Sequence, residues 1–264
     1  MKLGFIGCGN MATAIIRGIL NNGIAVKDEI IGADVSENSI DKVHKDLGIC
    51  VTTDNKEAAK QAEILFLSVK PQFYESVIAE IRGLIKDTQL IITIAPGKTL
   101  EWLENQFGRP VKLVRTMPNT PALVGEGITA ACHNDSVTED DLEKVKNILE
   151  SFGKCEIISE QLMDVVVSVS GSSPAYVFMF IEAMADAAVA DGMPRAQAYQ
   201  FAAQAVLGSA KMVLETGKHP GELKDMVCSP GGTTIEAVRV LEEKGMRSAV
   251  IEAMKACTRK AKGM

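Results

Sequence analysis

A glycine-rich turn near the start of the chain restricts the possible folds more than any other feature. Gly7, Gly9 and Ala12 complete the pattern GxGxxA between a short apolar segment, residues 2–6, and a segment with apolar residues at helical spacing, residues 12–20. The first glycine permits a tight turn, the second lets a pyrophosphate approach the backbone, and the small third residue lets helix and strand pack closely. A turn without a ligand is the alternative, but the flanking strand and helix favour a dinucleotide site whose phosphates bind the helix N-terminus. The residues predicted to hold the pyrophosphate are Gly7, Cys8, Gly9, Asn10, Met11 and Ala12.

Strand and helix signals alternate through the first 160 residues. The segment 64–69, ILFLSV, is an unbroken apolar run, as expected for a strand covered on both faces. Further strands are predicted at 2–6, 29–33, 90–95, 111–115 and 128–132, and a polar helix at 37–47. Such alternation is typical of right-handed crossovers that build a parallel sheet with helices on both faces.

Beyond residue 160 the strand signals fade and alanine-rich helices take over. Helical periodicity is present at 174–190, 194–214, 234–243 and 246–260, with proline and glycine between these segments. The predicted class is α/β: a Rossmann-like N-terminal domain with a parallel-core sheet over 1–160, and an all-helical C-terminal domain over 161–264. About 100 helical residues are too few to cover two apolar faces alone, so we expect this domain to form an obligate dimer.

Composition and charge exclude several classes of protein. The chain has 264 residues and a net charge of −6, whereas nucleic-acid-binding proteins usually have a basic excess. The six cysteines are scattered, with no CxxC and no Cys/His cluster, so we expect reduced thiols and no metal site. No apolar run approaches the roughly 20 residues that span a bilayer. These observations predict a cytoplasmic protein without nucleic-acid or membrane partners.

Asp34, at the end of the second predicted strand, bears on the choice of cofactor. A carboxylate at this place can accept a hydrogen bond from an adenosine ribose hydroxyl, which favours NADH and repels the 2′-phosphate of NADPH. A solvated loop aspartate is the alternative. Ser36 and Asn38 can donate to a phosphate, so the choice between NADPH and NADH stays open.

Three further loops follow predicted strands, where ligands of open α/β sheets bind. Lys70 can approach a phosphate or ribose, Gly97 permits a close backbone approach, and Asn119 in MPNTP offers a donor and an acceptor. The alternatives are an exposed loop charge for Lys70 and a plain structural turn for 117–121. The residues predicted to line the cofactor cleft are Ser68, Val69, Lys70, Pro71, Ala95, Pro96 and Gly97.

Two clusters of Gly, Ser and Pro in the second half have the composition of ligand sites. Residues 170–176, SGSSPAY, are expected to open a long helix with several hydroxyls and free amides. Residues 229–234, SPGGTT, open another helix, and their two glycines offer N–H donors suited to a carboxylate. A capping box between Thr233 and Glu236 is the structural alternative.

The three histidines, His44, His133 and His219, lie apart from all of these loops. The sequence contains no arrangement that suggests a Ser/His/Asp triad, a catalytic pair of carboxylates or a set of metal ligands. We therefore expect the chemistry to come from a bound cofactor, with the protein supplying position and polarity.

Several motifs, in order along the whole chain, resemble the pyrroline-5-carboxylate reductase family. They are GFIGCGNMA, ILFLSVKP, MPNTP, SGSSPAY and the highly specific HPGELKDMVCSPGGTTIEAVRVLE. The resemblance implies a helical C-terminal domain that binds substrate and interlocks subunits as homodimers, often assembled further. It also implies NADPH- or NADH-dependent reduction of the cyclic imine 1-pyrroline-5-carboxylate to L-proline, the last step of proline biosynthesis.

The resemblance assigns roles to individual residues. Gly7–Ala12 would hold the pyrophosphate, and Asn55 would lie near the adenosine ribose. Ser229, Gly232 and Thr233 would bind the substrate carboxylate, and Thr234 would face the ring nitrogen as the catalytic residue.

Two positions depart from the family pattern. Pro96 stands where the family usually has Ala, so the backbone contact there is expected to differ. Asp34 stands where other members have Ser or Asn, which argues against a strict NADPH preference.

Two other functions compete with this interpretation. A β-hydroxyacid dehydrogenase of similar architecture would place a catalytic Lys on a helix soon after the interdomain segment, and residues 168–191 contain no Lys. A cofactor sensor without turnover would need no second polar site such as SPGGTT. Both observations favour the reductase.

Overall fold

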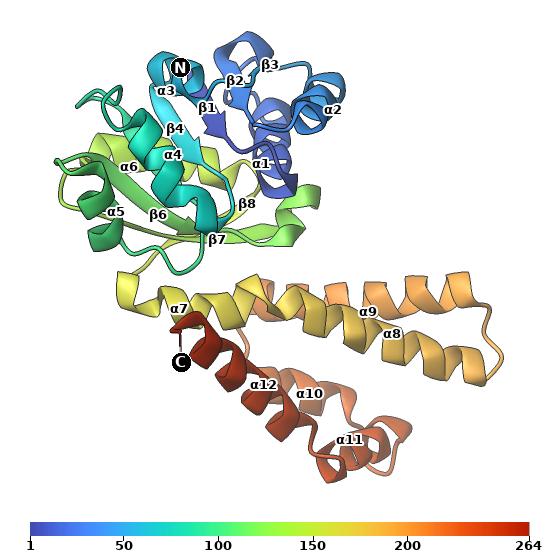
Figure 1. Ribbon diagram of the computed structural model, residues 1–264. Coiled ribbons are helices and arrows are strands. Elements are labelled where there is room, and N and C mark those ends of the chain that lie inside the picture. Colours follow the sequence, from blue (N-terminus) through green and yellow to red (C-terminus); the bar gives the residue numbers. More distant parts are fainter. Residues whose placement is uncertain (264) are drawn as a thin grey trace. The chain divides into compact units, whose positions relative to one another are not determined.

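The computed structural model describes residues 1–263, which divide into two compact units (Figure 1). Unit 1 comprises residues 1–172 together with the segment from Thr258 onward, and unit 2 comprises Ser173–Cys257. The α/β class and the helical C-terminal part are both confirmed. The exact domain boundary at residue 160 stays a prediction.

Unit 1 is built on one sheet with strand order β3-β2-β1-β4-β5-β6-β7-β8. The strands from β3 to β6 are parallel, β7 is antiparallel to β6, and β8 is parallel to β7. The parallel core agrees with the alternation of strand and helix signals. The strands are β1 (Leu3–Ile6), β2 (Ile30–Ala33), β3 (Cys50–Thr52), β4 (Ile64–Leu67), β5 (Leu90–Thr93), β6 (Lys112–Met117), β7 (Gly127–His133) and β8 (Gly153–Ile157).

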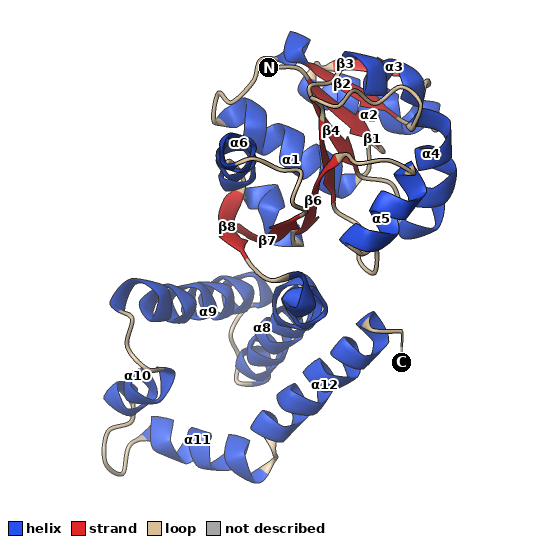
Figure 2. Cartoon of the chain, turned by 90° about the vertical axis from the view of Figure 1, so that its left-hand side faces the viewer, coloured by secondary structure: helices blue, strands red, loops and turns tan. Residues whose placement is uncertain are grey.

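Helices cover both faces of this sheet (Figure 2). One face is covered by α1 (Asn10–Asn21), α2 (Glu37–Leu47) and α6 (Glu139–Glu150), and the other by α3 (Asn55–Gln61), α4 (Tyr74–Ile81) and α5 (Leu100–Phe107). Short 3₁₀ turns lie at Lys27–Glu29, Pro71–Phe73, Thr120–Val124 and Glu160–Leu162.

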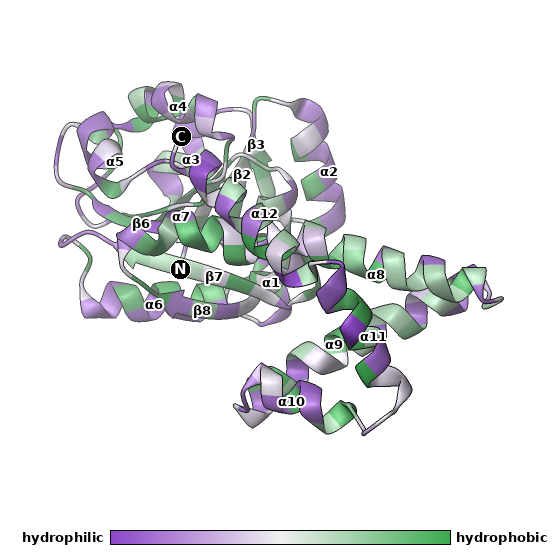
Figure 3. Cartoon of the chain, turned by 90° about the horizontal axis from the view of Figure 1, so that it is seen from below, coloured by the Kyte–Doolittle hydropathy of each residue, from purple (hydrophilic) through white to green (hydrophobic). Residues whose placement is uncertain are grey.

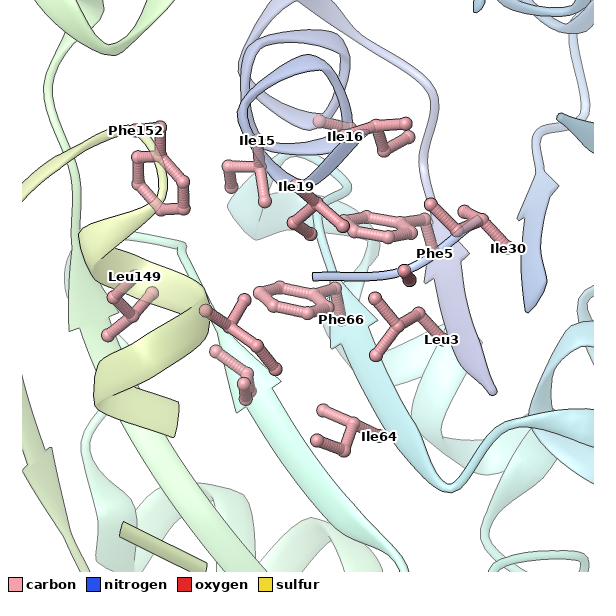
Figure 4. Packing of buried hydrophobic residues seen from close by; sticks show 14 of the residues in the cluster. Leu3, Phe5, Ile15, Ile16, Ile19, Ile30, Ile64, Phe66, Leu149 and Phe152 are labelled. Atoms are coloured by element: carbon pink, nitrogen blue, oxygen red, sulfur yellow. The ribbon is translucent and has the colours of Figure 1, made fainter. Parts of the chain in front are cut away.

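Alternating side chains of the central strands fill two separate apolar cores. Ile64 and Phe66 of β4 point into the core beneath α1 and α6, whereas Leu65 and Leu67 point into the core beneath α4 and α5. In the first core the rings of Phe5 and Phe66 stack at 4.5 Å between centroids (Figure 4). Burial on both faces is what the unbroken apolar strand sequences require.

The C-terminal part is helical, as expected. The four predicted helices are present with ends within two residues of the expected ones, and α10 is an additional short helix. The elements are α7 (Met163–Val166), a π-helical turn (Val167–Gly171), α8 (Ser173–Ala190), α9 (Arg195–Thr216), α10 (Pro220–Val227), α11 (Thr233–Glu243) and α12 (Met246–Ala261).

The helical run Glu160–Ala190 corrects one expectation from the sequence. It is long and apolar enough to cross a membrane by length and composition alone, with a mean hydropathy of 1.4, although no such run was expected. Its apolar side chains are mostly uncovered within one chain, because only 11% of the window is buried. In Figure 3 both α8 and α9 carry many hydrophobic residues along their length.

A buried arginine fixes the start of this run to the sheet of unit 1. Arg115 of β6 is only 3% exposed, and its guanidinium donates to Glu160 Oε1 at 2.8 Å. The same oxygen accepts from the backbone N–H of Leu100 at 2.8 Å, and Asp164 Oδ1 lies 3.9 Å from Arg115. A buried guanidinium needs such partners, so the sheet, α5 and the first helical turns after residue 160 are held together.

Asp141 caps α6 and pairs with the sheet, and this gives a prediction about stability. Its Oδ2 accepts from Lys112 Nζ at 2.6 Å and from the Thr138 hydroxyl at 2.8 Å. Burial by itself would raise the pKa of Asp141, but the hydrogen bonds from Lys112 and Thr138 hold that pKa below its ordinary value. A lowered pKa means that the stabilisation is present above the ordinary value and is lost as the pH falls through the folded-state value.

We expect Asp141→Asn to lower the free energy of unfolding by about 1–2 kcal/mol at neutral pH. The difference from the unsubstituted protein should shrink as the pH falls from about 5 to below 3. Urea unfolding at matched protein concentration measures it. Asp140→Asn, in the same helical turn but exposed, is the control and should cost only a few tenths of a kcal/mol. A difference that is constant with pH would contradict the assignment.

Candidate functional site

The glycine-rich turn after β1 has a geometry that requires glycine at its first position. Gly7 has φ +99°, and a Cβ added to it would lie 2.7 Å from backbone atoms of Ser68 and Val69. Its N–H donates to Ala33 O at 2.7 Å, which fixes the turn to the end of β2. Both the backbone conformation and the close approach to the loop after β4 exclude a side chain here.

The next glycine opens helix α1 toward solvent. Gly9 is the N-cap residue, it is exposed, and no atom lies within 4 Å of the place that a Cβ would occupy. The first intrahelical bond runs from Thr13 N to Gly9 O, so the amides of Asn10, Met11 and Ala12 have no acceptor within the helix. An open, uncapped helix N-terminus of this kind fits the pyrophosphate of a dinucleotide.

Asp34 lies directly beside this turn. Its Oδ2 accepts from Cys8 N at 2.8 Å and its Oδ1 accepts from Ser36 N at 2.9 Å. The half-buried carboxylate therefore joins the loops after β1 and β2. It places a negative charge at the edge of the turn, as the proposed interaction with ribose requires.

The loops after β4 and β5 lie at the same edge of the sheet. Ser68 Oγ donates to Ile6 O at 3.0 Å and to Gly7 O at 2.7 Å, which ties the β4 loop to the glycine-rich turn. In the β5 loop, Ala95 is buried while Pro96 and Gly97 are exposed, and Gly97 has φ +74°. The fold thus brings four groups of predicted cofactor-binding residues together at the carboxyl ends of adjacent strands. They are Gly7–Ala12, Asp34, Ser68–Pro71 and Ala95–Gly97.

Asn55 and Asn119 use their side chains within the protein. Asn55, the first residue of α3, is buried, and its Nδ2 donates to Glu80 Oε2 at 2.9 Å. The role of Asn55 near the ribose stays a prediction. Asn119 accepts from Ile128 N at 2.9 Å and donates to Ser170 O at 3.1 Å, which favours the plain structural reading of the MPNTP loop.

Residues 170–176 include the start of α8 at Ser173, as expected, but a π-helical turn leads directly into that helix. Ser170 and Gly171 belong to the π-helical turn that continues from α7, and Ser172 N donates to Val167 O at 2.8 Å. The amide of Ser172 is therefore used within the helical run and is not free. A π-helical turn inside an α-helix is often found at functional sites.

In unit 2, residues 229–234 form a tight turn that leads into α11. Gly231 has φ +68°, and Gly232 N donates to Ser229 O at 3.0 Å. A Cβ on Gly232 would lie 2.3 Å from Ser229 Oγ, so glycine is required for the hydroxyl to lie over the start of the helix. Thr233 and Thr234 are the first two residues of α11.

The prediction of a capping box between Thr233 and Glu236 is wrong. The N-cap residue is Gly232, which places Thr233 one position too late to cap the helix. Glu236 instead accepts from Arg239 at 2.7 Å. The helix N-terminus therefore begins without a side-chain cap, which leaves it available for an anion.

Sequence reasoning does not single out Tyr74, whose hydroxyl lies at the ends of β4 and β5, or Arg115, which pairs with Glu160. A lone tyrosine in an amphipathic helix gives no usable signal. The arginine inside the apolar strand sequence KLVRTM is a usable signal, because a charged residue in a buried strand needs a partner.

Comparisons with known proteins cover the whole chain. Residues 160–264 match the family model for pyrroline-5-carboxylate reductase dimerisation, and residues 2–97 match that for NADP oxidoreductase, coenzyme F420-dependent. Pyrroline-5-carboxylate reductase of Escherichia coli strain K12 is 55% identical over 260 residues, which is 98% of this chain and 97% of that protein. The enzyme of Methanosarcina acetivorans is 44% identical over 253 residues, 96% of this chain and 94% of that protein. The crystal structure of Plasmodium falciparum pyrroline carboxylate reductase with NADP bound superposes with a TM-score of 0.91 at 34% identity, covering 100% of this chain and 97% of that one.

Proposed function

The chain belongs to the pyrroline-5-carboxylate reductase family, and we propose on this premise how its residues carry out the reaction. The activity is NAD(P)H-dependent reduction of the C=N bond of 1-pyrroline-5-carboxylate to give L-proline. The observation that carries this assignment is the 55% identity to the Escherichia coli enzyme over 98% of the chain.

The dinucleotide binds at the carboxyl ends of β1, β2, β4 and β5. The open N-terminus of α1 holds the pyrophosphate, and the loops Ser68–Pro71 and Ala95–Gly97 line the cleft. Asp34 and Asn55 face the adenosine ribose. Support comes from the turn geometry at Gly7 and Gly9, which leaves unpaired amides beside open space. When bound, the nicotinamide supplies a hydride to the imine carbon.

The substrate binds at the turn before α11. Ser229 and the N–H groups of Gly232 and Thr233 hold the carboxylate, and the Gly232 N–H exchanges its 3.0 Å bond to Ser229 O for this contact. The Thr234 hydroxyl hydrogen-bonds at the ring nitrogen. Support comes from the uncapped N-terminus of α11, whose free N–H groups and positive dipole end attract a carboxylate. Such local donors are needed because the protein as a whole has a net charge of −6. An imine protonates far more easily than a ketone, so no His or Lys acid is required at this position.

The helical domain spans 161–264, binds the substrate and mediates dimer formation. The dimerisation family model begins at residue 160, where Glu160 pairs with Arg115. Dimers of this kind assemble into a larger homo-oligomer, and the enzyme is cytoplasmic. The apolar run Glu160–Ala190 is then a dimer surface rather than a membrane segment, because the whole run lies within the residues that match the dimerisation model.

Assembly gives a testable prediction. Among the described residues of unit 2, the buried apolar ones are only Ala185, Ala198, Ala202 and Leu223. By contrast, Phe178, Met179 and Phe201 are each more than 60% exposed, a surface that water disfavours. We therefore expect an obligate dimer with a large apolar interface, which light scattering should detect as a species of twice the chain mass in the active protein. A stable, active monomer would refute this.

The function itself is tested by mixing the purified protein with the imine and either NADPH or NADH. The nicotinamide absorbance should fall and proline should form in equal amount. A folded dimer that consumes neither cofactor with this imine would overturn the proposal.

A further inference from the structure

The hydroxyl of Tyr74 lies at the point where β4 and β5 separate. Tyr74 is the first residue of α4 and is fully buried. Its hydroxyl donates to Leu67 O at 2.5 Å and accepts from Ile94 N at 3.4 Å. Leu67 ends β4, and Ile94 directly follows β5. One side chain therefore bonds to the ends of both strands.

The main-chain ladder between these strands weakens at this point. Its last register pair is Leu67 with Thr93, and the next bond, from Ile94 N to Leu67 O, is 3.4 Å long. Burial raises the pKa of the Tyr74 hydroxyl, and the backbone amides of Ile94 and Ala95 offset part of that rise. The hydroxyl therefore stays protonated and keeps its donor bond to Leu67.

Two neighbouring hydroxyls bridge the adjacent strands in the same way. Ser68 Oγ donates to Ile6 O and Gly7 O across β4 and β1. Thr116 Oγ1 donates to Thr93 O at 2.8 Å across β6 and β5. Together Ser68, Tyr74 and Thr116 form a row of hydroxyls that holds four adjacent strands where they diverge.

We propose that Tyr74 is a positioning residue for the cofactor: its hydroxyl sets the spacing between the loops Ser68–Pro71 and Ala95–Gly97. The inference rests on the proposed function, since these loops are the proposed walls of the dinucleotide cleft. A shift of a wall by a fraction of an ångström alters how well the bound dinucleotide fits its cleft. A tyrosine needed only to fill the core would be replaceable by phenylalanine, which occupies nearly the same volume.

Tyr74→Phe tests this directly, because it removes the hydroxyl and leaves the ring. We expect the Kd of NADPH, titrated by nicotinamide fluorescence, to rise about 5-fold to 30-fold. The KM for NADPH should rise by the same factor while kcat stays within about twofold of the unsubstituted value. Thr116→Val, which removes the next hydroxyl of the row, should also raise the Kd of NADPH. If Tyr74→Phe does not fold, the Kd of the Thr116→Val protein tests the proposal instead.

Ser151→Ala is the matched control. It removes another buried hydroxyl, whose Oγ donates to Ile148 O at 2.6 Å at the end of α6, and should lower stability without changing the Kd of NADPH. If Tyr74→Phe behaves like Ser151→Ala, with lowered stability and an unchanged Kd, the positioning role is overturned. Absence of turnover by the unsubstituted protein with the imine would instead overturn the proposed function and would leave this comparison of Kd values intact.

Discussion

Thr234→Ala is expected to lower kcat/KM for the imine by about 10-fold to 10³-fold, the range for one positioned polar group. The nitrogen of the imine must carry a proton as electron density arrives, and in the proposed arrangement the Thr234 hydroxyl orients the ring through that nitrogen. Orientation of this kind holds the reacting carbon in place. Steady-state rates at saturating cofactor measure the loss.

The position of Thr234 in α11 separates chemistry from stability. Because Gly232 is the N-cap residue, Thr234 lies inside the first helical turn and does not cap it. Alanine is a better helix former than threonine, so the helix should be retained. Thr234→Ser, which keeps the hydroxyl, should retain most of the activity. The Kd of the cofactor should barely change, because Thr234 lies outside the glycine-rich turn. Full turnover by a folded Thr234→Ala protein would exclude a chemical role for the hydroxyl.

The regular elements of the fold follow from the sequence where one signal dominates. The helix at 37–47 is observed with the same ends, because Ser36 accepts from Ser39 N at its start and Gly48 follows its end with φ +71°. The buried strands are equally clear, since apolar runs such as residues 64–67 have no other stable place in a soluble domain.

Elements that depend on tertiary contacts were not predictable in the same way. β3 has three half-exposed or exposed residues, and β8 has the mixed sequence GKCEI, so neither has an apolar pattern. Both lie at the edges of the sheet, where hydrogen bonding to one neighbour determines the strand. The π-helical turn at Val167–Gly171 was not predictable either: α8 begins at Ser173 as expected, but nothing in the sequence indicates that a helical turn precedes it.

In the candidate site, too, some features follow from the sequence and others depend on tertiary contacts. The motif at Gly7–Ala12 predicts its own geometry, because positive φ and close approach both require glycine. Asp34 was singled out for its place at a strand end, but its bonds to Cys8 N and Ser36 N depend on how two loops meet. No pattern in the sequence specifies that contact, and it changes what a substitution at Asp34 should do.

Asp34→Ser should increase the use of NADPH relative to NADH by about tenfold or more, which corresponds to about 1–3 kcal/mol. The substitution removes a negative charge beside the place proposed for the ribose, where the 2′-phosphate of NADPH would be repelled. It also releases the amide of Cys8, which now donates to Asp34 Oδ2. A released amide at the edge of the turn adds a donor for an anion. The ratio of the two kcat/KM values measures the effect.

Two further variants separate the charge of Asp34 from its structural bonds. Asp34→Asn removes the charge but keeps an oxygen that can accept from one of the two amides, so it should shift the ratio in the same direction if charge is the cause. Glu37→Gln removes a nearby but exposed carboxylate, at the first residue of α2, and should leave the ratio nearly unchanged. If only Asp34→Ser shifts the ratio, the released amide of Cys8 is responsible rather than the charge. If neither Asp34 variant shifts it, Asp34 only joins the loops after β1 and β2, and cofactor preference is set elsewhere.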